Sequence, residues 1–144
     1  MLERARKKAA EAGLDIPFYR QDCTKLNLTL EVPLIFMTGS SFRHFLTNED
    51  QNALFESIKR HLQPNGYFIF DARSPLLGEL AEIFDPITQV LHCTAVMETV
   101  EDGEVAHVEK SSISLRYTYP QELFWLIEGH GFELIALFGD WSKA

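Results

Sequence analysis

The sequence predicts an α/β domain: a partial parallel sheet lies between helices in three αβα layers, and an antiparallel β-hairpin is inserted into it. Residues 34–37 and 67–70 are short, continuously apolar runs, which is typical of parallel strands buried on both faces. The residues between them have a helical pattern and supply the crossover that parallel strands require. Two segments rich in β-branched residues, 87–100 and 105–117, flank Asp102-Gly103, a strong hairpin turn signal.

The chain begins with a predicted helix. Residues 2–12 are rich in Ala, Lys, Arg and Glu, and their apolar side chains recur at helical spacing. Gly13 ends this helix, because glycine adopts the left-handed C-cap conformation at little cost. Residues 16–21 are predicted to form a short strand, and residues 25–33 a loop or a short edge strand.

The helix between the two central strands has clear start and stop signals. Thr47 is predicted to cap it, and Asp50 stands where a capping box places its acidic partner. Pro64-Asn65-Gly66 ends the helix and turns the chain. Its buried stripe consists of apolar residues one helical turn apart: Leu54, Ile58 and Leu62.

The last part of the chain alternates between helical and strand patterns. A brief helical signal covers residues 76–84, before the hairpin of residues 87–117. Pro120 is favoured at the first position of a last helix. Residues 132–138 are predicted to form a final strand.

Length and composition limit the function classes. The 144 residues are 46% hydrophobic, enough for one domain with a sizeable core. A net charge of −8 argues against a nucleic-acid-binding protein. No apolar run is long enough for a membrane span or a signal peptide, so we expect a cytoplasmic protein. Cys23 and Cys93 lack the spacing of metal ligands, and no metal site is expected.

The loops after Met37 and Phe70 are predicted to form the ligand-binding edge. Open parallel sheets bind ligands beyond the carboxyl ends of their strands. The loop Thr38-Gly39-Ser40-Ser41 suits this role, because glycine permits close backbone approach and hydroxyls donate or accept hydrogen bonds. The alternative is a merely flexible loop.

Aromatic and basic residues near this edge are candidates to contact a substrate. Phe42 and Phe45, with Ser41, are candidates to line a pocket. His44 is a candidate general base near neutral pH, although a lone histidine between aromatic residues is more often packed or capping. Arg73 follows the second strand and either pairs with a substrate carboxylate or forms a surface salt bridge.

Residues from the late segments are further candidates to close the pocket. They are Tyr117, Asp140 and Trp141. The alternative for all three is ordinary surface or core packing.

Five motifs follow one another in a specific order. They are Met1-Leu2-Glu3-Arg4-Ala5, the segment from Phe18 to Cys23, the segment from Leu34 to Phe42, the segment from Leu62 to Asp71 with its Pro64-Asn65-Gly66 turn, and Tyr119-Pro120-Gln121-Glu122-Leu123 with the later Gly131-Phe132. In this order and spacing they resemble the class I S-adenosylmethionine-dependent methyltransferases, which have a Rossmann-like fold.

The resemblance implies S-adenosylmethionine as the cofactor of the complete fold. It implies that Met1 and Leu2 pack on the adenine, that the Asp22 carboxylate accepts a hydrogen bond from the adenine amino group, and that the Cys23 backbone N–H meets a ring nitrogen. Thr38, Gly39 and Ser40 follow the strand that faces the methyl group in this family. Without the resemblance, Asp22 is an ordinary cap after a strand, and Met1 and Leu2 simply contribute to the packing of the helix.

The sequence also departs from the family pattern. It contains no G-x-G-x-G run, the loop that grips the methionyl part of the cofactor in this family. The acidic residue that ends the family's second strand and holds the ribose hydroxyls is also not found. The family's last strand is not recognisable after Trp141. We therefore expect residues 1–144 to form a single truncated methyltransferase-like domain with weak or no cofactor binding.

Two functions fit these observations. The first is methyl transfer to a small molecule, which mainly needs donor and acceptor held together in a dry pocket and does not require a catalytic triad. The alternative is a non-catalytic α/β dimerisation module that descends from a methyltransferase. The hairpin of residues 87–117 either covers a substrate or forms a dimer contact. Unpaired apolar surface on the first helix and on residues 18–21 predicts a homodimer or a swapped oligomer.

Overall fold

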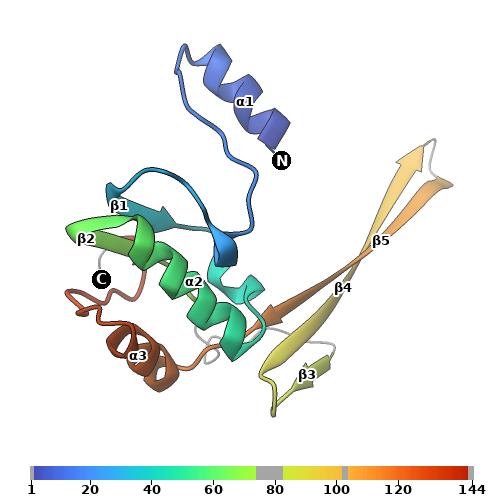
Figure 1. Cartoon of the computed structure of the whole chain (residues 1–144). Helices are drawn as coiled ribbons and strands as arrows, with labels where there is room; N and C mark the ends of the chain where they lie inside the picture. Colours follow the sequence, from blue (N-terminus) through green and yellow to red (C-terminus); the bar gives the residue numbers. More distant parts are fainter. Residues whose placement is uncertain (1, 74–82, 102–103, 143–144) are drawn as a thin grey trace.

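Figure 1 shows the computed structural model of the chain, which describes residues 2–73, 83–101 and 104–142. The elements, in chain order, are α1 (Leu2–Glu11), the 3₁₀ turn η1 (Cys23–Lys25), β1 (Val32–Met37), the 3₁₀ turn η2 (Ser41–His44), α2 (Asn48–His61), β2 (Leu62–Phe70), β3 (Ile83–Asp85), β4 (Val90–Glu101), β5 (Glu104–Arg116) and α3 (Pro120–Gly129).

The strands β1 and β2 form the predicted parallel pair, connected through η2 and α2. Leu34 lies opposite Tyr67, and Met37 lies opposite Phe70. The backbone N–H of Asp71 donates to the carbonyl of Met37 at 3.3 Å and extends the ladder by one residue. Since a parallel pair brings both carboxyl ends to one edge, the two loops that follow these strands meet there.

β2 begins at Leu62, earlier than predicted, so the predicted turn lies within the strand as an irregularity. Asn65 adopts a left-handed conformation with φ of 62°. A Cβ at Gly66 would lie 2.9 Å from the carbonyl oxygen of Gln63 and 3.1 Å from that of Pro33. Only glycine permits this close approach of backbones.

The Thr47 cap and the Leu54 and Ile58 positions of the predicted stripe are confirmed, whereas Leu62, the third predicted position, follows α2 and begins β2. The hydroxyl oxygen of Thr47 accepts a hydrogen bond of 3.1 Å from the backbone N–H of Asp50. Leu54, Phe55 and Ile58 are buried on the side that faces the sheet. The last turn carries basic residues, which suits the negative end of the helix dipole.

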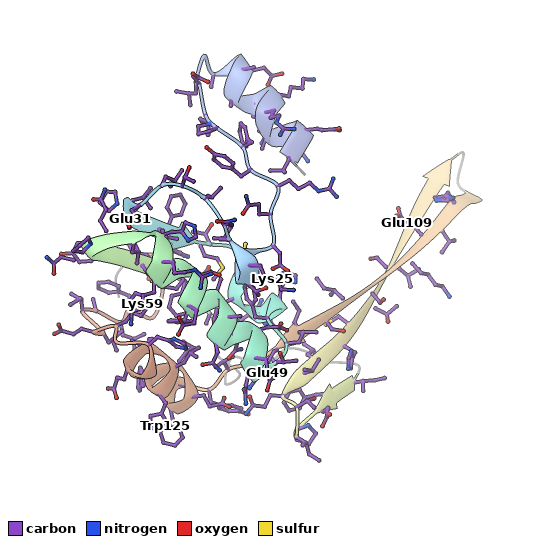
Figure 2. All side chains as sticks on the ribbon, viewed as in Figure 1. Lys25, Glu31, Glu49, Lys59, Glu109 and Trp125 are labelled. Carbon is purple, nitrogen blue, oxygen red and sulfur yellow. The ribbon has the colours of Figure 1, made fainter. Side chains whose placement is uncertain are left out.

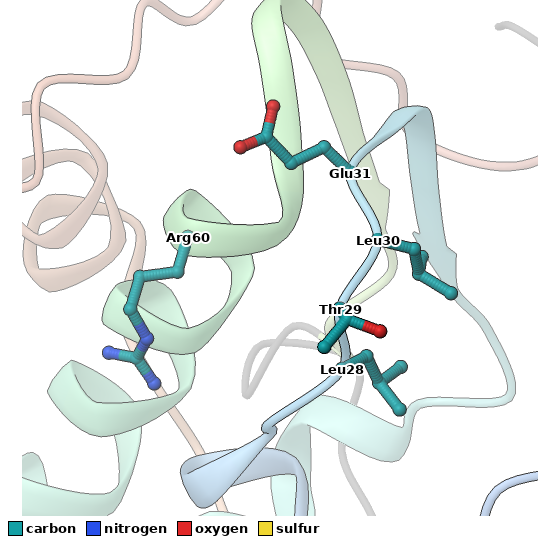
Figure 3. Close-up of a pocket in the computed structure, with 5 residues that line it drawn as sticks. All are labelled: Leu28, Thr29, Leu30, Glu31 and Arg60. Atoms are coloured by element: carbon teal, nitrogen blue, oxygen red, sulfur yellow. The ribbon is translucent and has the colours of Figure 1, made fainter.

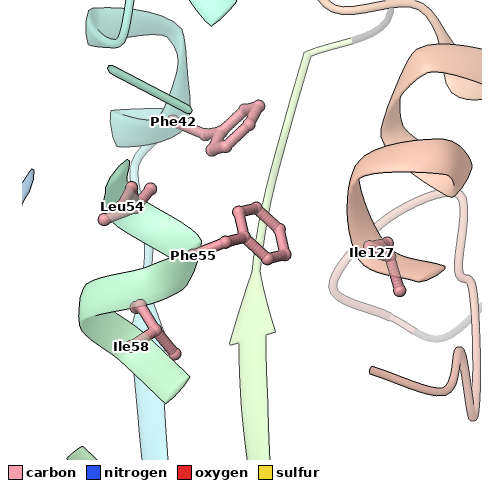
Figure 4. Close-up of a cluster of buried hydrophobic side chains, with 5 residues drawn as sticks. All are labelled: Phe42, Leu54, Phe55, Ile58 and Ile127. Atoms are coloured by element: carbon pink, nitrogen blue, oxygen red, sulfur yellow. The ribbon is translucent and has the colours of Figure 1, made fainter. Parts of the chain in front are cut away.

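The core lies between one face of the β1–β2 pair and the two helices α2 and α3. Figure 4 shows the cluster at its centre, which consists of Phe42, Leu54, Phe55, Ile58 and Ile127. The ring of Phe55 makes edge-to-face contacts with the rings of Phe68 and Phe70, at centroid distances of 5.7 and 5.9 Å. Such geometry adds to the burial energy of the rings.

The prediction that both faces of this sheet are buried is wrong for the described residues. Leu34, Phe36, Tyr67 and Ile69 are 46%, 69%, 60% and 46% exposed. Side chains alternate between faces along a strand, so these four lie on the face opposite α2. The described part of the sheet therefore has a helical layer on one side only.

Two predicted strands do not form. Residues 16–21 and 132–138 contain no assigned strand, because a strand needs a partner and neither segment has one among the described residues. Phe132 nevertheless packs against the core cluster. The predicted helix at residues 76–84 lies largely outside the described residues, and its last two positions belong to β3 instead.

The two strands of the predicted hairpin are confirmed, and its predicted Asp102-Gly103 turn lies outside the described residues. β4 and β5 pair antiparallel over their full lengths, and β3 adds a short third strand beside Val90–His92. This second sheet is separate from the parallel pair. Figure 1 shows the ribbon projecting away from the body, with β5 in contact with η2 at its base.

Candidate functional site

The carboxyl edge of the β1–β2 pair is shaped by a tight loop. The backbone turns sharply after Thr38, with left-handed φ values of 72° at Gly39 and 55° at Ser40. The hydroxyl of Ser41 donates to the carbonyl of Thr38 at 2.6 Å and closes the loop. A positive φ at serine is uncommon and requires support from neighbouring groups.

That support comes from Asp71, at the end of the neighbouring strand. Its Oδ1 atom accepts a hydrogen bond of 2.9 Å from the backbone N–H of Ser40. A carboxylate that accepts from a backbone N–H makes a stronger bond than a neutral acceptor. Asp71 therefore holds the loop after β1 against the end of β2.

Thr38, Gly39, Ser40 and Ser41 thus come together with the segment Asp71 to Arg73, as the sequence predicted for this edge. Thr38 and Gly39 are exposed, and Ser40 and Ser41 are half-buried. Arg73 is exposed at the same edge. The loop presents hydroxyls and backbone groups to solvent, which is suited to binding a polar ligand.

The aromatic candidates are mostly structural in this arrangement. Phe42 is 1% exposed and contacts the rings of Phe45 and Phe70 within the core. Tyr117 is buried, with the guanidinium carbon of Arg43 4.6 Å from its ring centroid. Trp141 is 65% exposed.

His44, the candidate base, is exposed at the end of η2. It lies next in sequence to Arg43, which is buried and was not singled out from the sequence. The available signal for Arg43 was an arginine within the run Phe42-Arg43-His44-Phe45, because arginine often stacks on aromatic rings.

The candidates for adenine binding lie on α1 and η1. Asp22 caps η1: its Oδ1 accepts from the backbone N–H of Thr24 at 2.9 Å and from the Thr24 hydroxyl at 2.8 Å. These hydrogen bonds, the backbone one first, lower the pKa of the Asp22 carboxyl below its ordinary value. Cys23 is exposed, Leu2 is half-buried on α1, and Met1 lies outside the described residues.

The turn η1 is held on α2 by polar contacts. The hydroxyl of Ser57 donates to the carbonyl of Thr24 at 2.9 Å. Buried His61 accepts from the backbone N–H of Leu28 at its Nε2 (3.0 Å) and donates from Nδ1 to the Ser57 carbonyl (2.7 Å). These two partners require a neutral ring with the proton on Nδ1.

Two shallow depressions lie away from this edge. Figure 3 shows the first, of about 400 Å³, lined by Leu28, Thr29, Leu30, Glu31 and Arg60 at the amino end of β1. The second, of about 390 Å³, lies between the first turns of α2 and α3, where Trp125 points outward (Figure 2). Its polar groups bond to one another: Arg116 donates to the side chain of Asn48 at 2.8 Å, and Gln51 donates to the hydroxyl of Thr118 at 2.8 Å. Several polar groups of the second depression are therefore already paired within the chain.

Neither a membrane-spanning helix nor a metal-binding cluster occurs among the described residues. None of the helices in the ranges 2–73, 83–101 and 104–142 combines the length and apolar character that crossing a bilayer requires. Among the same residues, no group of three or more His, Cys, Asp or Glu side chains is arranged to hold a metal ion.

Comparison with known proteins gives matches to a methyltransferase domain and to solved methyltransferase structures. Residues 1–66 match the family model described as a methyltransferase domain. The methyltransferase CcbJ from Streptomyces caelestis superposes with a TM-score of 0.84 at 23% identity, over 99% of this chain and 64% of that one. This chain has a partial class I methyltransferase fold.

Other methyltransferases show the same fold. An S-adenosylmethionine-dependent methyltransferase from Clostridium acetobutylicum matches with a TM-score of 0.69 at 21% identity, over 90% of this chain and 58% of that one. The glycopeptide N-methyltransferase MtfA, complexed with S-adenosylmethionine, matches with a TM-score of 0.56 at 17% identity, over 86% of this chain and 53% of that one. The chain thus spans 53% to 64% of the length of these three. No curated protein sequence matches the chain.

Proposed function

We propose that this chain provides the methyl-acceptor side of an S-adenosylmethionine-dependent methyltransferase that acts on a small molecule. The observation that carries the proposal is the hydrogen bond between the Ser40 N–H and the Asp71 carboxylate. It joins the two loops at the carboxyl edge of the parallel pair, where this class of sheet binds its ligands.

The chemistry of this edge suits methyl transfer from a sulfonium. The reaction is an in-line displacement, and the protein contributes chiefly by holding donor and acceptor in line. The Thr38–Ser41 loop offers exposed backbone groups and hydroxyls for this purpose. His44 is exposed one turn further on and serves as base only for acceptors that must lose a proton.

The hairpin is proposed to cover the acceptor. β5 contacts η2 at the base of the ribbon, and Tyr117, directly after β5, stacks against Arg43 of η2. The base of the ribbon therefore lies beside η2, the turn that follows the Thr38–Ser41 loop. The second candidate function, a non-catalytic dimerisation module, would instead use the exposed Val96 and Val108 of the ribbon as a contact between chains.

A thermal-shift measurement tests the proposal. A ligand present at ten times its dissociation constant stabilises the folded chain by about 1.4 kcal/mol. We expect S-adenosylhomocysteine at millimolar concentration to raise the melting temperature of the wild type and of Arg60→Ala by a few degrees. We expect Asp71→Ala to lose this shift. An equal shift in Asp71→Ala, or a shift abolished by Arg60→Ala, would contradict the assignment of the site to the carboxyl edge.

A further inference from the structure

One face of the parallel pair carries a continuous apolar surface. Leu34 and Phe36 of β1 lie opposite Tyr67 and Ile69 of β2, so the four exposed side chains form one block, named here the open face. Contiguous exposed apolar surface of this kind marks an interaction site.

The N-terminal arm, defined as residues 2–20, forms a second apolar surface apart from the first. Leu14, Ile16 and Tyr19 on this arm are 58%, 46% and 51% exposed. Figure 1 shows α1 standing clear of the parallel pair, at the end of an extended connection. The arm holds together by itself, because the Leu14 N–H donates to the Ala9 carbonyl at 2.9 Å and the guanidinium carbon of Arg6 lies 5.9 Å from the ring centroid of Phe18.

The charges of the arm and of the whole chain are complementary. The arm contains five basic and three acidic side chains, a net +2 on a chain of net charge −8. The arm of one copy is therefore attracted to the acidic body of another, and electrostatic attraction of this kind steers association.

The exit of the arm from the body is fixed. Gln21 accepts from the backbone N–H of Asn27 at 2.9 Å and donates to its carbonyl, and Asp22 caps the turn that follows. These bonds hold the connection where it leaves η1, in the position in which the arm stands away from its own sheet. A second copy can supply the missing contact without changing them.

We propose that two copies exchange their N-terminal arms, with the arm of each docked on the open face of the other. An exchange of identical elements produces the same contact twice around a twofold axis and closes the assembly at a dimer. Burial of the exposed apolar side chains on both surfaces drives the association. The proposal requires no cofactor and stands independently of the function proposed above.

Light scattering after size-exclusion chromatography tests the exchange. The wild type should elute at twice the 16.5 kDa mass of one chain. The face variant Phe36→Asp and the arm variant Ile16→Asp should each elute as monomers, because both positions are exposed and the charge disrupts only the contact. Val108→Asp, at an exposed position of the hairpin, should remain dimeric.

Mixing the variants identifies the occupant of the open face. The Phe36→Asp chain keeps an intact arm, and the Ile16→Asp chain keeps an intact open face. One of the two contacts can therefore form between them, so an equimolar mixture should regain dimers that neither variant forms alone. A monomeric wild type, or a monomeric mixture, would overturn the exchange. Dissociation by Val108→Asp would overturn it in favour of a hairpin contact.

Discussion

The carboxylate of Asp71 accepts a hydrogen bond of 2.9 Å from the backbone N–H of Ser40, 31 residues earlier in the chain. This bond joins the ends of two parallel strands and supports a serine with a left-handed backbone. It explains why an aspartate follows the apolar run of residues 67–70. The hydrogen bond between Asp71 and Ser40 therefore fixes the shape of the carboxyl edge.

Replacing Asp71 tests the support directly. Loss of a hydrogen bond to a charged acceptor costs about 1.5–3 kcal/mol. We expect Asp71→Ala to lower the free energy of unfolding by about this amount and to speed hydrogen exchange at the Ser40 amide. Asp71→Asn keeps an acceptor oxygen and should lose less. Urea unfolding and exchange measured by NMR check both, and equal losses in the two variants would contradict the role of the oxygen.

The two histidines of the central unit should differ sharply. Buried His61 connects the Leu28 N–H to the Ser57 carbonyl, and an unsatisfied buried group costs about 1–3 kcal/mol. We expect His61→Ala to destabilise the chain by about 2–3 kcal/mol, whereas exposed His44→Ala should stay within about 0.5 kcal/mol. Urea unfolding of the two variants compares them, and similar losses would show that the 23–31 segment is not anchored by His61.

The aromatic core supplies a third prediction. Phe55 is fully buried and contacts the rings of Phe42, Phe68, Phe70 and Phe132. Phe55→Ala should cost about 3–5 kcal/mol, as large-to-small changes in aromatic cores do. Phe138→Ala, at a 53% exposed position outside the core cluster and the open face, is the matched control and should cost far less. Denaturant midpoints for the two variants decide whether Phe55 lies at the centre of the core.

Acid should release the cap of η1. The hydrogen bonds from Thr24 lower the pKa of the Asp22 carboxyl. The ionised carboxyl therefore stabilises the folded chain at pH values above the ordinary pKa of aspartate, about 3.9. The contribution is lost as the pH falls through the lowered pKa, when the carboxyl takes up a proton. In an NMR titration the Thr24 amide should report a midpoint below the ordinary value, and Thr24→Ala should raise it. A wild-type midpoint at or above the ordinary value would contradict the cap.

Local signals predicted much of this fold because they act within a few residues. The Thr47 cap, the stripe of Leu54 and Ile58, and the Asp102-Gly103 turn signal with its flanking β-branched segments each specify their element through nearby groups. The parallel pairing followed from two apolar runs with a helix between them. The loop at Thr38–Ser41 was placed at the carboxyl edge for the same reason.

The predictions that were wrong concern features that depend on residues far away in the sequence. Residues 16–21 and 132–138 have the composition of strands, but pairing requires a neighbour at hydrogen-bonding distance, which composition does not supply. The burial of Phe42 could likewise not be predicted from the sequence, because it depends on contacts with the rings of Phe55 and Phe70. Asp71 was visible only as the residue that ends a strand, since its partner lies in another loop.

The central claim is that the carboxyl edge of β1 and β2 is the ligand-binding edge. Titration of the isotope-labelled chain with S-adenosylhomocysteine, followed by NMR, tests it most directly. We predict weak binding, because the sequence contains no glycine-rich G-x-G-x-G loop, with shifts concentrated at residues 38–41 and 71–73. Shifts confined to Leu28–Glu31 and Arg60, or tight binding by these 144 residues, would contradict the account.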